Sequence, residues 1–514
     1  MSRTELDPVT FLRRSAAIYP DRVAVVDGEL RRTYAALQER VNRLASALRA
    51  RGVQHVDRVA ALCPNVPELL ELHFGVPAAG GVLVAINFRL SAREIGYILG
   101  HSGAQVLFVD PELEPLIADA PADVDVVRLG EPYERLLADG DATDASSLLG
   151  DEQDPIAIDY TSGTTGRPKG VVYTYRGAYL NALGEVIEAE LGHHPVYLWT
   201  LPMFHCNGWC FPWAVTAAGG THVCLRQVDP AAVWRLFREE GVTHYCGSPT
   251  VHSALVHHPS AAPLEQMVTA LVAAAPPSPT LLARMEALNM RVVHVYGLTE
   301  TYGPHTVRSA QDDWDSPSVE DRARLLARQG QGYTTADLVR VVDEQMRDVA
   351  RDGDTLGEVI MRGNNVTAGY FADENATEQA FRGGWFHSGD LAVWHPDDAI
   401  ELRDRAKDVI ISGGENISSI EVEQAICAHP AVLECAVVAV PDDHWGERPK
   451  AFVTLQDGAS VGEQDIIDFC RGRLAHFKCP DTIEVRTLPK TSTGKVQKFA
   501  LREPEWRTRE RRIN

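Results

Sequence analysis

The feature that most constrains the fold of this sequence is an alternation of short apolar runs with segments of helical periodicity. Residues 58–63 and 105–109 are mostly apolar runs of strand length, and residues 68–74 between them have helical spacing. A longer helix before the first run can begin after Thr33 and end at Gly52, with apolar residues at helical spacing (Leu37, Val41, Leu44 and Leu48). Strands separated by helices form a mostly parallel sheet covered on both faces, so we expect an α/β fold.

The chain is too long for a single domain. Its 514 residues exceed the size at which one hydrophobic core usually keeps growing. Charge density rises at residues 401–408, and a shorter stretch follows in which helix and strand signals alternate again (helices at 419–429 and 463–474, strands at 435–440 and 451–455). We therefore expect a large N-terminal domain and a smaller C-terminal domain. Residues 110–154 are polar and weakly periodic, which predicts a variable surface connection.

Composition and charge exclude several classes of protein. A hydrophobic fraction of 45% and a charged fraction of 23% are ordinary for a globular chain and unlike disordered, collagen-like or coiled-coil sequences. The longest apolar run, residues 75–86, is too short to cross a bilayer, and the N-terminus shows no apolar signal region, so we expect a cytoplasmic location. With 49 Lys and Arg against 71 Asp and Glu, the formal charge of -22 disfavours nucleic acid and anionic membranes as partners.

The most informative motif is the loop at residues 160–170, which lies between two apolar, strand-like runs. From Thr161 to Gly170 it holds three glycines, four hydroxyl side chains and Lys169. Glycine allows backbone N–H groups to approach an anion, while hydroxyl groups and a lysine add donors and positive charge. The pattern is not the usual nucleotide P-loop, because Pro168 stands where that motif needs glycine. An ordinary surface turn is the alternative, but the density of donors favours an anion site.

Three later segments add groups that suit a nucleotide. An apolar run at 292–295 leads into Tyr296, which could stack on a planar ring, and Glu300, which could hold Mg²⁺ bridged to phosphate. Asp390 suits the hydroxyl groups of a ribose, and Lys495 lies on a further loop of glycine and threonine. Taken singly, these residues have plain alternatives as a core tyrosine, solvated carboxylates and an exposed lysine.

Taken together, five segments resemble the adenylate-forming superfamily of acyl-CoA synthetases, peptide-synthetase adenylation domains and luciferases. The segments match in order and spacing over essentially the whole chain (160–170, 296–300, 385–391, 404–416 and 489–495). Within the superfamily, residues 201–210 and 412–419 resemble short- and medium-chain acyl-CoA synthetases, notably the methylmercaptopropionate–CoA ligase type. The resemblance implies an N-terminal domain over 1–404, a hinge at 405–407 that includes Lys407, and a mobile C-terminal lid domain over 408–514.

The resemblance also implies a reaction and a role for each matching residue. A short or medium carboxylic acid attacks the α-phosphorus of ATP to give an acyl-adenylate and pyrophosphate, and coenzyme A then displaces AMP. Lys495 would bridge the acid carboxylate and the α-phosphate, where two anions must meet. The implied nucleotide contacts are the phosphate loop (Thr161, Ser162, Gly163, Thr164, Thr165, Gly166 and Lys169), the adenine site (Ala274, Ala275, Pro276, Tyr296 and Gly297), the α-phosphate and Mg²⁺ site (Thr299 and Glu300, with Thr161) and the ribose site (Asp390 and Arg405).

The thiol step is implied to follow a rotation of the lid domain. That rotation would withdraw Lys495 and bring Gly413 and Gly414 to line a narrow pantetheine channel, where a side chain would collide. His205 matches a gate between this channel and the acyl pocket. The remaining residues implied at the channel and pocket lie in two segments (Gly208 and Trp209; Gly247).

Departures from the family pattern leave alternatives open. Thr174 and Tyr175 stand where the family usually has histidine, and Asp398 and Ala399 stand where it usually has Gly-Tyr. One alternative is a diazotase-type relative that activates nitrite with ATP and transfers it to an aryl amine without coenzyme A. Another is a nucleotide-binding regulatory protein that has lost catalysis. The partners expected are an acid, ATP and coenzyme A, with no nucleic acid and no membrane, and a homodimer is left open.

Overall fold

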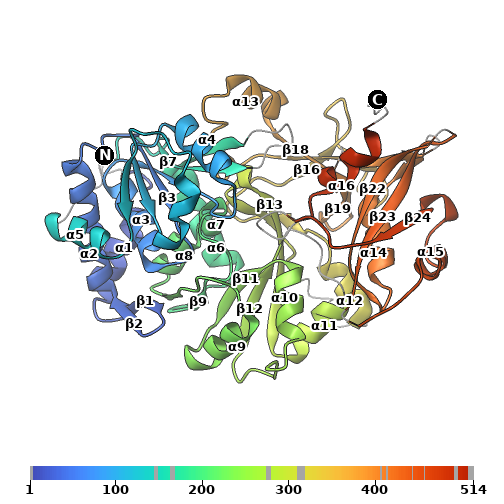
Figure 1. Cartoon of the computed structure of the whole chain (residues 1–514), viewed down its shortest axis with the longest axis horizontal. Helices are drawn as coiled ribbons and strands as arrows, with labels where there is room; N and C mark the ends of the chain where they lie inside the picture. Colours follow the sequence, from blue (N-terminus) through green and yellow to red (C-terminus); the bar gives the residue numbers. More distant parts are fainter. Residues whose placement is uncertain are drawn as a thin grey trace. The chain divides into compact units, whose positions relative to one another are not determined.

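The structure of the chain is a computed structural model that describes most of its length. The described residues are 4–143, 149–161, 168–273, 279–309, 319–405, 408–412, 415–442, 444–456, 458–490 and 496–507. They form two compact units, the first of Met1–Val339 with Met361–Phe386 and the second of Arg340–Ile360 with His387–Asn514 (Figure 1). The hinge predicted at 405–407 falls largely outside the described residues, so the predicted domain boundary stays a prediction.

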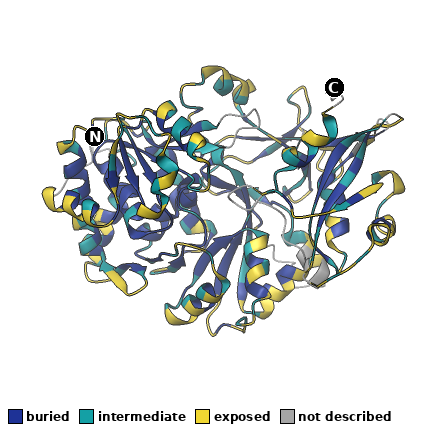
Figure 2. Cartoon of the chain, in the orientation of Figure 1, coloured by how far each residue is buried: buried dark blue, intermediate teal, exposed yellow. Residues whose placement is uncertain are grey.

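The first unit contains the predicted parallel sheet. Its strand order is β6-β5-β3-β4-β7-β8, and all neighbours are parallel except β7 and β8, which form an antiparallel hairpin. The six strands are β3 (Arg58–Leu62), β4 (Val82–Ala85), β5 (Val106–Val109), β6 (Asp125–Arg128), β7 (Pro155–Thr161) and β8 (Lys169–Thr174). The strands predicted at 58–63 and 105–109 are therefore confirmed. Figure 2 shows these strands as mostly buried.

The helices around this sheet follow the predicted apolar pattern. Helix α2 (Tyr34–Ala50) begins after Thr33, whose hydroxyl accepts a hydrogen bond from the Ala36 N–H at 3.2 Å. The four leucine and valine side chains predicted to face the core are fully buried (Leu37, Val41, Leu44 and Leu48). The neighbouring helices are α3 (Pro67–Ala78) and α4 (Ala92–Ser102). Every residue of α3 except Glu68 is buried, so this helix forms part of the core.

The prediction of a surface connection over residues 110–154 is wrong. This segment contains a 3₁₀ helix, η1 (Pro111–Ile117), the edge strand β6 and helix α5 (Glu131–Asp139). Helix α5 buries Tyr133, Leu136 and Leu137, and β6 pairs with β5 along its whole length. Helix α5 has three buried side chains and β6 has one, Val127, too few to stand out from their acidic surroundings.

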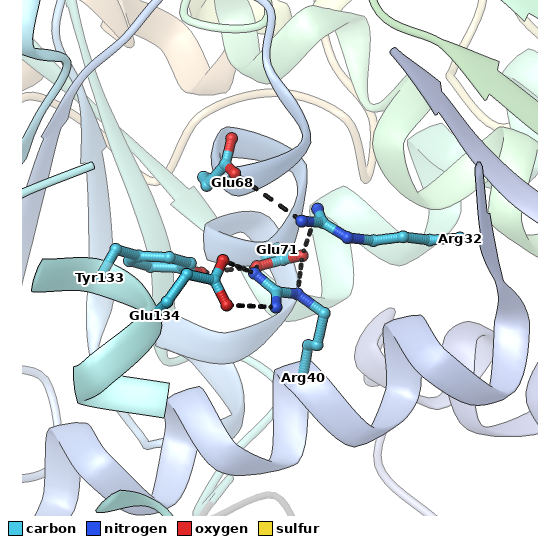
Figure 3. Close-up of polar contacts among 6 residues, drawn as sticks. All are labelled: Arg32, Arg40, Glu68, Glu71, Tyr133 and Glu134. Carbon is cyan, nitrogen blue, oxygen red and sulfur yellow. Dashed lines mark hydrogen bonds and ion pairs between the residues drawn. The ribbon is translucent and has the colours of Figure 1, made fainter. Parts of the chain in front are cut away.

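A buried ion network joins α5 to α2 and α3 (Figure 3). The Glu71 side chain on α3 has no exposed surface, and its carboxylate lies 2.9 Å from Arg32 Nη1 and 2.6 Å from Arg40 Nε. The Tyr133 hydroxyl and Arg40 Nη2 donate to the other carboxylate oxygen of Glu71 at 2.7 and 3.2 Å, and Arg40 also pairs with Glu134. Both carboxylate oxygens of Glu71 are thus satisfied, as a buried charge requires. The network ties together α2, α3, α5 and β2 (Leu30–Thr33).

A second sheet of nine strands completes the first unit. Its order is β15-β14-β13-β12-β11-β9-β10-β1-β2, with a parallel centre from β13 to β1 and antiparallel edges. The strands not yet given are β1 (Val23–Asp27), β9 (Val196–Leu198), β10 (Thr221–Val223), β11 (His244–Gly247), β12 (Val268–Val272), β13 (Met290–Leu298), β14 (Gly303–Val307) and β15 (Gln331–Gly332). Further helices of the first unit are α1 (Val9–Ile18), α6 (Tyr175–Glu188), α8 (Phe211–Ala217), α9 (Pro230–Glu239), α10 (Pro249–Val256), α11 (Pro279–Ala287), α12 (Val319–Leu326) and α13 (Glu374–Ala380).

The second unit is built from two smaller sheets. One has the order β16-β17-β18-β19, with strands β16 (Arg340–Val342), β17 (Leu356–Met361), β18 (Phe386–Trp394) and β19 (Ile400–Arg405). The other contains β20 (Ile410–Ser412), β21 (Glu415–Ile417), β22 (Val432–Asp442), β23 (Gly446–Leu455) and β24 (Thr482–Val485), packed with α14 (Ser419–Cys427), α15 (Glu463–Arg471) and α16 (Lys498–Trp506). The helices and strands predicted after residue 408 are confirmed. Across the described part of the chain, no helix is both long enough and apolar enough to span a bilayer.

Candidate active site

The predicted anion loop joins the two strands of a hairpin. Thr161, the last residue of β7, pairs with Lys169, the first residue of β8. The loop therefore does follow one strand and precede another, as predicted from the sequence. Its central residues lie outside the described residues (Ser162, Gly163, Thr164, Thr165 and Gly166).

A tyrosine that sequence reasoning missed links Lys169 to Glu300. The ammonium nitrogen of Lys169 lies 4.8 Å from the centre of the Tyr370 ring, and the Tyr370 hydroxyl donates to Glu300 Oε1 at 2.8 Å. Burial raises the pKa of Tyr370, so its phenol stays a hydrogen-bond donor. The backbone supports this arrangement, because Phe371 N–H donates to the Gly170 carbonyl and Thr367 N–H to the Glu300 carbonyl, both at 2.7 Å.

The predicted residues after β13 meet the same hairpin. The Tyr173 hydroxyl on β8 donates to the Thr299 carbonyl at 2.6 Å, which fixes the 3₁₀ turn η2 (Thr299–Thr301) that carries Glu300. Gly297 is required here, since a Cβ at this position would lie 1.9 Å from the Gly303 carbonyl oxygen. Tyr296, at the end of the same strand, is 8% exposed. Thr299 and Glu300 are thus brought close to strand β8 of the hairpin, and their phosphate and metal roles stay predictions.

The segment after His205 has an unusual backbone. Residues Cys206, Asn207, Gly208, Trp209 and Cys210 have φ angles of +51°, +47°, +56°, +56° and +64°, so the short helix α7 (Cys206–Trp209) and the residue after it are left-handed. Side chains pack closely on this turn, because a Cβ on Gly208 would lie 2.6 Å from the Trp199 ring and one on Gly303 would lie 2.6 Å from the Trp209 ring. The sequence pattern gave no sign of this left-handed turn.

A buried carboxyl group lies beneath the turn. Asp159 on β7 is 2% exposed and accepts hydrogen bonds from Asn207 N at 3.1 Å and from Asn207 Nδ2 at 2.7 Å. Burial raises the pKa of Asp159 from 3.8 to about 8. The titratable side chains around it have pKa values raised by burial and are neutral acids (Tyr173, Cys206, Cys210 and Tyr302). The signal that could have identified Asp159 is a carboxylate inside an otherwise apolar strand.

The second unit brings the two predicted ribose ligands together. Asp390 on β18 and Arg405 on β19 are direct cross-strand partners, and Arg405 Nε lies 3.1 Å from Asp390 Oδ1. The Asp390 side chain is 6% exposed and the Arg405 side chain 33% exposed, so the pair combines a sheltered carboxylate with an accessible cation. The Ser388 hydroxyl accepts a hydrogen bond from the Asp390 N–H at 3.1 Å, which fixes the strand at this point.

Comparisons with known proteins decide the family. Residues 12–371 match the AMP-binding enzyme family, and residues 421–495 match the C-terminal domain of AMP-binding enzymes. The chain belongs to the AMP-binding enzyme family. An acetate/butyrate–CoA ligase of Arabidopsis thaliana, described as peroxisomal, is 43% identical over 97% of this chain and 94% of its own length. A 4-hydroxybutyrate–CoA ligase of Metallosphaera sedula is also 43% identical, with the same coverage of both chains.

A solved structure agrees with this assignment. ATP-bound MatB from Rhodopseudomonas palustris superposes with a TM-score of 0.86 at 28% identity, over 97% of this chain and 99% of that one. The predicted membership of the adenylate-forming superfamily is therefore confirmed, and so is the predicted fold class.

Several residues expected in an AMP-binding enzyme of this type lie outside the described residues (Ala274, Ala275, Pro276, Lys407, Gly413, Gly414 and Lys495). Their neighbours are described. Strands β20 and β21 pair on either side of the Gly413–Gly414 dipeptide, and Lys490 and Val496 form an antiparallel bridge on either side of the segment that carries Lys495. Gly247 ends β11, where a Cβ would lie 3.1 Å from His252 Nε2.

The raised pKa of Asp159 predicts how stability depends on pH. In the unfolded chain this carboxyl ionises near its ordinary pKa of 3.8, whereas in the folded protein it keeps its proton up to about pH 8. The contribution of the Asp159 carboxyl to the free energy of unfolding is therefore complete below about pH 4 and is lost as the pH rises toward 8. We expect the melting temperature of wild type minus that of Asp159→Asn, as measured by calorimetry, to decrease when the pH is raised from 5 to 8.5. Melting temperatures of the two proteins that change in parallel with pH would contradict the assignment.

Proposed function

We propose that this enzyme is an AMP-forming acid–CoA ligase that activates a short or medium carboxylic acid with ATP and transfers the acyl group to coenzyme A. The observation that carries the proposal is the near full-length similarity to an acetate/butyrate–CoA ligase and to a 4-hydroxybutyrate–CoA ligase. Neither relative favours the nitrite-activating alternative. Two sets of polar groups support the proposal, each within its own unit: Lys169, Tyr370 and Glu300 in the first, and the Asp390–Arg405 pair in the second.

In the first half-reaction an oxygen of the acid carboxylate bonds to the α-phosphorus of ATP. The bond from this phosphorus to the oxygen bridging to the β-phosphorus breaks, and pyrophosphate leaves with the electron pair. Both reactants are anions, so the rate depends on preorganised positive charge where they meet. Lys495 supplies that charge in our proposal. The Thr161–Lys169 loop binds the β- and γ-phosphates, and Thr299 binds the α-phosphate.

The residues at this site fit a magnesium ion held mainly by ATP. Mg²⁺ usually takes one or two carboxylates together with substrate phosphates and water, rather than a cage of protein ligands. Consistent with this, the described part of the chain has no cluster of three or more His, Cys, Asp or Glu side chains placed to hold a metal. Glu300 and the Thr161 hydroxyl would hold the ion, and its charge would offset that of the phosphates. Tyr370 orients the Glu300 carboxylate for this role.

In the second half-reaction the coenzyme A thiolate bonds to the acyl carbon. The bond from that carbon to the oxygen bridging to the phosphate breaks, and AMP leaves with this oxygen and the electron pair. We propose that residues 408–514 turn about Lys407 between the two steps. This movement withdraws Lys495 and places Gly413 and Gly414 along the pantetheine arm. The thiol then enters past His205, with the remaining pocket and channel residues around it (Gly208, Trp209 and Gly247).

The ribose assignment predicts a loss of ATP affinity. Asp390→Ala removes a sheltered carboxylate that would accept hydrogen bonds from ribose hydroxyl groups and leaves Arg405 without its 3.1 Å partner. A hydrogen bond to a charged group is worth about 1.5–3 kcal/mol, so KM for ATP should rise by roughly tenfold or more. Asp398→Ala is the matched control, because Asp398 forms an exposed ion pair with Arg351 in the same unit. Equal KM values for ATP in the two variants would contradict the ribose role.

The proposed reaction is tested with purified enzyme, Mg·ATP and a panel of acids from two to eight carbons, each with and without coenzyme A. We expect acyl-CoA and AMP to form in equal amounts with at least one acid. AMP release that requires nitrite and an aryl amine and does not depend on coenzyme A would support the diazotase-type alternative. No AMP with any substrate would favour the non-catalytic alternative.

The cytoplasmic location and the homodimer stay predictions. We propose a cytoplasmic enzyme, while noting that the Arabidopsis relative is described as peroxisomal. Fluorescent tagging at either terminus and light scattering of the purified protein would test these two predictions separately.

A further inference from the structure

The left-handed turn at residues 206–210 is strained. A residue with a side chain costs roughly 1–2 kcal/mol in the left-handed region, and four of these five residues are not glycine. Such a conformation persists only where the surrounding structure fixes it, and it often marks a functional site.

The contacts that fix the turn converge on Asn207. Its backbone N–H donates to Asp159 Oδ1 at 3.1 Å and its side-chain amide donates to Asp159 Oδ2 at 2.7 Å. Both residues are buried, at 2% exposure for Asp159 and 0% for Asn207. The next contact is weaker, since Asn181 Nδ2 lies 3.5 Å from the Trp209 carbonyl oxygen. Asp159 therefore provides the main polar anchor of the turn.

The turn lies against the segment that carries the proposed α-phosphate ligands. The Cys206 thiol donates to the Thr299 hydroxyl at 3.5 Å, and the Trp209 ring lies where a Cβ on Gly303 would be. His205 immediately precedes the turn and shares its backbone, because Gly208 N–H donates to the His205 carbonyl at 2.9 Å. A change in the turn would therefore move side chains at the point where the acid meets the α-phosphate.

We propose that Asp159 is a positioning residue for acid binding: through its two hydrogen bonds to Asn207 it holds the left-handed turn that places His205 and Trp209 beside the acid. This inference rests on the proposed function, because it assumes that an acid is activated next to Thr299.

The anchor needs a polar side chain of this size rather than a charge. The Asn207 side-chain oxygen is buried and accepts no hydrogen bond of good geometry among the described residues, and His73 on α3 is the other side chain that interacts with the Asn207 amide. In Asp159→Asn, the new amide oxygen can accept from the Asn207 N–H. The NH₂ group of the new side chain can donate to the Asn207 oxygen after the Asn207 side-chain amide has rotated by about 180°. In Asp159→Ala, both donors of Asn207 lose their acceptors in a dry environment, which costs about 1–3 kcal/mol for each group.

The test measures acid-dependent exchange of pyrophosphate into ATP by the full-length enzyme, with the acid and ATP varied in turn. We expect Asp159→Ala to raise KM for the acid by about tenfold or more and KM for ATP by no more than about threefold. Asp159→Asn should keep both values close to wild type. If Asp159→Ala does not yield folded protein, Asp159→Leu removes the same hydrogen bonds without leaving a large cavity.

The control separates positioning from simple loss of stability. Glu71→Gln weakens a buried network that shares no residue with this turn, and it should lower the melting temperature while leaving both KM values unchanged. An unchanged KM for the acid in Asp159→Ala would overturn the proposal, as would an equal rise in both KM values. If wild type shows no exchange with any acid, the proposed function has failed. A crystal structure of Asp159→Ala then decides the inference, because a turn that keeps positive φ angles over 206–210 overturns it.

Discussion

Replacing Lys495 with alanine should slow acid adenylation by about 100-fold or more. In the first half-reaction a carboxylate must approach a triphosphate, and Lys495 is the cation proposed to bridge them. A specifically placed charge or donor in a site shielded from water is worth about 2.7–4 kcal/mol in the transition state, which corresponds to this loss of rate. The second half-reaction should be affected much less, because the lysine is withdrawn before the thiol attacks.

The two half-reactions can be measured separately. Adenylation is followed by exchange of pyrophosphate into ATP, and thioester formation by adding coenzyme A to a synthetic acyl-adenylate. Lys490→Ala is a matched control in the same segment, because Lys490 is already paired with Glu434 at 2.6 Å. We expect Lys490→Ala to behave like wild type in both assays. Full adenylation by Lys495→Ala, or equal losses in both half-reactions, would contradict the role proposed for Lys495.

Replacing Glu71 with alanine should cause the largest loss of stability. Glu71 has no exposed side-chain surface and accepts from two guanidinium groups and a phenol. Its removal would leave Arg32 and Arg40 partly buried beside a cavity, and Tyr133 without its acceptor. Breaking a buried ion pair in this way costs about 3–5 kcal/mol.

Calorimetry measures this loss as a fall in melting temperature, expected to be roughly 5 °C or more. Glu39→Ala is the matched control, because Glu39 makes an exposed pair with Arg43 on α2 that should contribute about 0.3–0.5 kcal/mol. Equal melting temperatures for the two variants would show that the network in Figure 3 adds little to stability.

Much of the fold could be predicted from local patterns. Helix α2 was recognisable because its leucines recur every three to four residues after a capping threonine. The strands of the parallel sheet were recognisable as short apolar runs, since both of their faces are covered. Helix α5 and strand β6 were missed, because neither contributes enough apolar residues to show a period. Their place in the fold depends on distant partners such as Glu71 on α3.

The candidate site likewise contains residues that local motifs reveal and residues that only the tertiary fold places. Motif residues such as Lys169, Glu300 and Asp390 could be named because the chemistry of a phosphate loop or a carboxylate is visible in a few consecutive residues. The side chains that hold the motif residues and their surroundings in place could not be predicted from the sequence. Tyr370 reaches Glu300 from 70 positions away, and Asp159 reaches Asn207 from 48 positions away. Such pairs are set by the tertiary fold, and neither residue of a pair signals the other in the sequence.

The acyl-adenylate intermediate is tested most directly with an acid that carries ¹⁸O in both carboxyl oxygens. Attack of the carboxylate on the α-phosphorus makes one of these oxygens the bridge between acyl group and phosphate. When coenzyme A displaces AMP, that oxygen leaves with the phosphate. Mass spectrometry should therefore find one ¹⁸O atom in each AMP formed and one in each acyl-CoA. Unlabelled AMP, with the label in pyrophosphate or in water instead, would contradict activation of the acid as an adenylate.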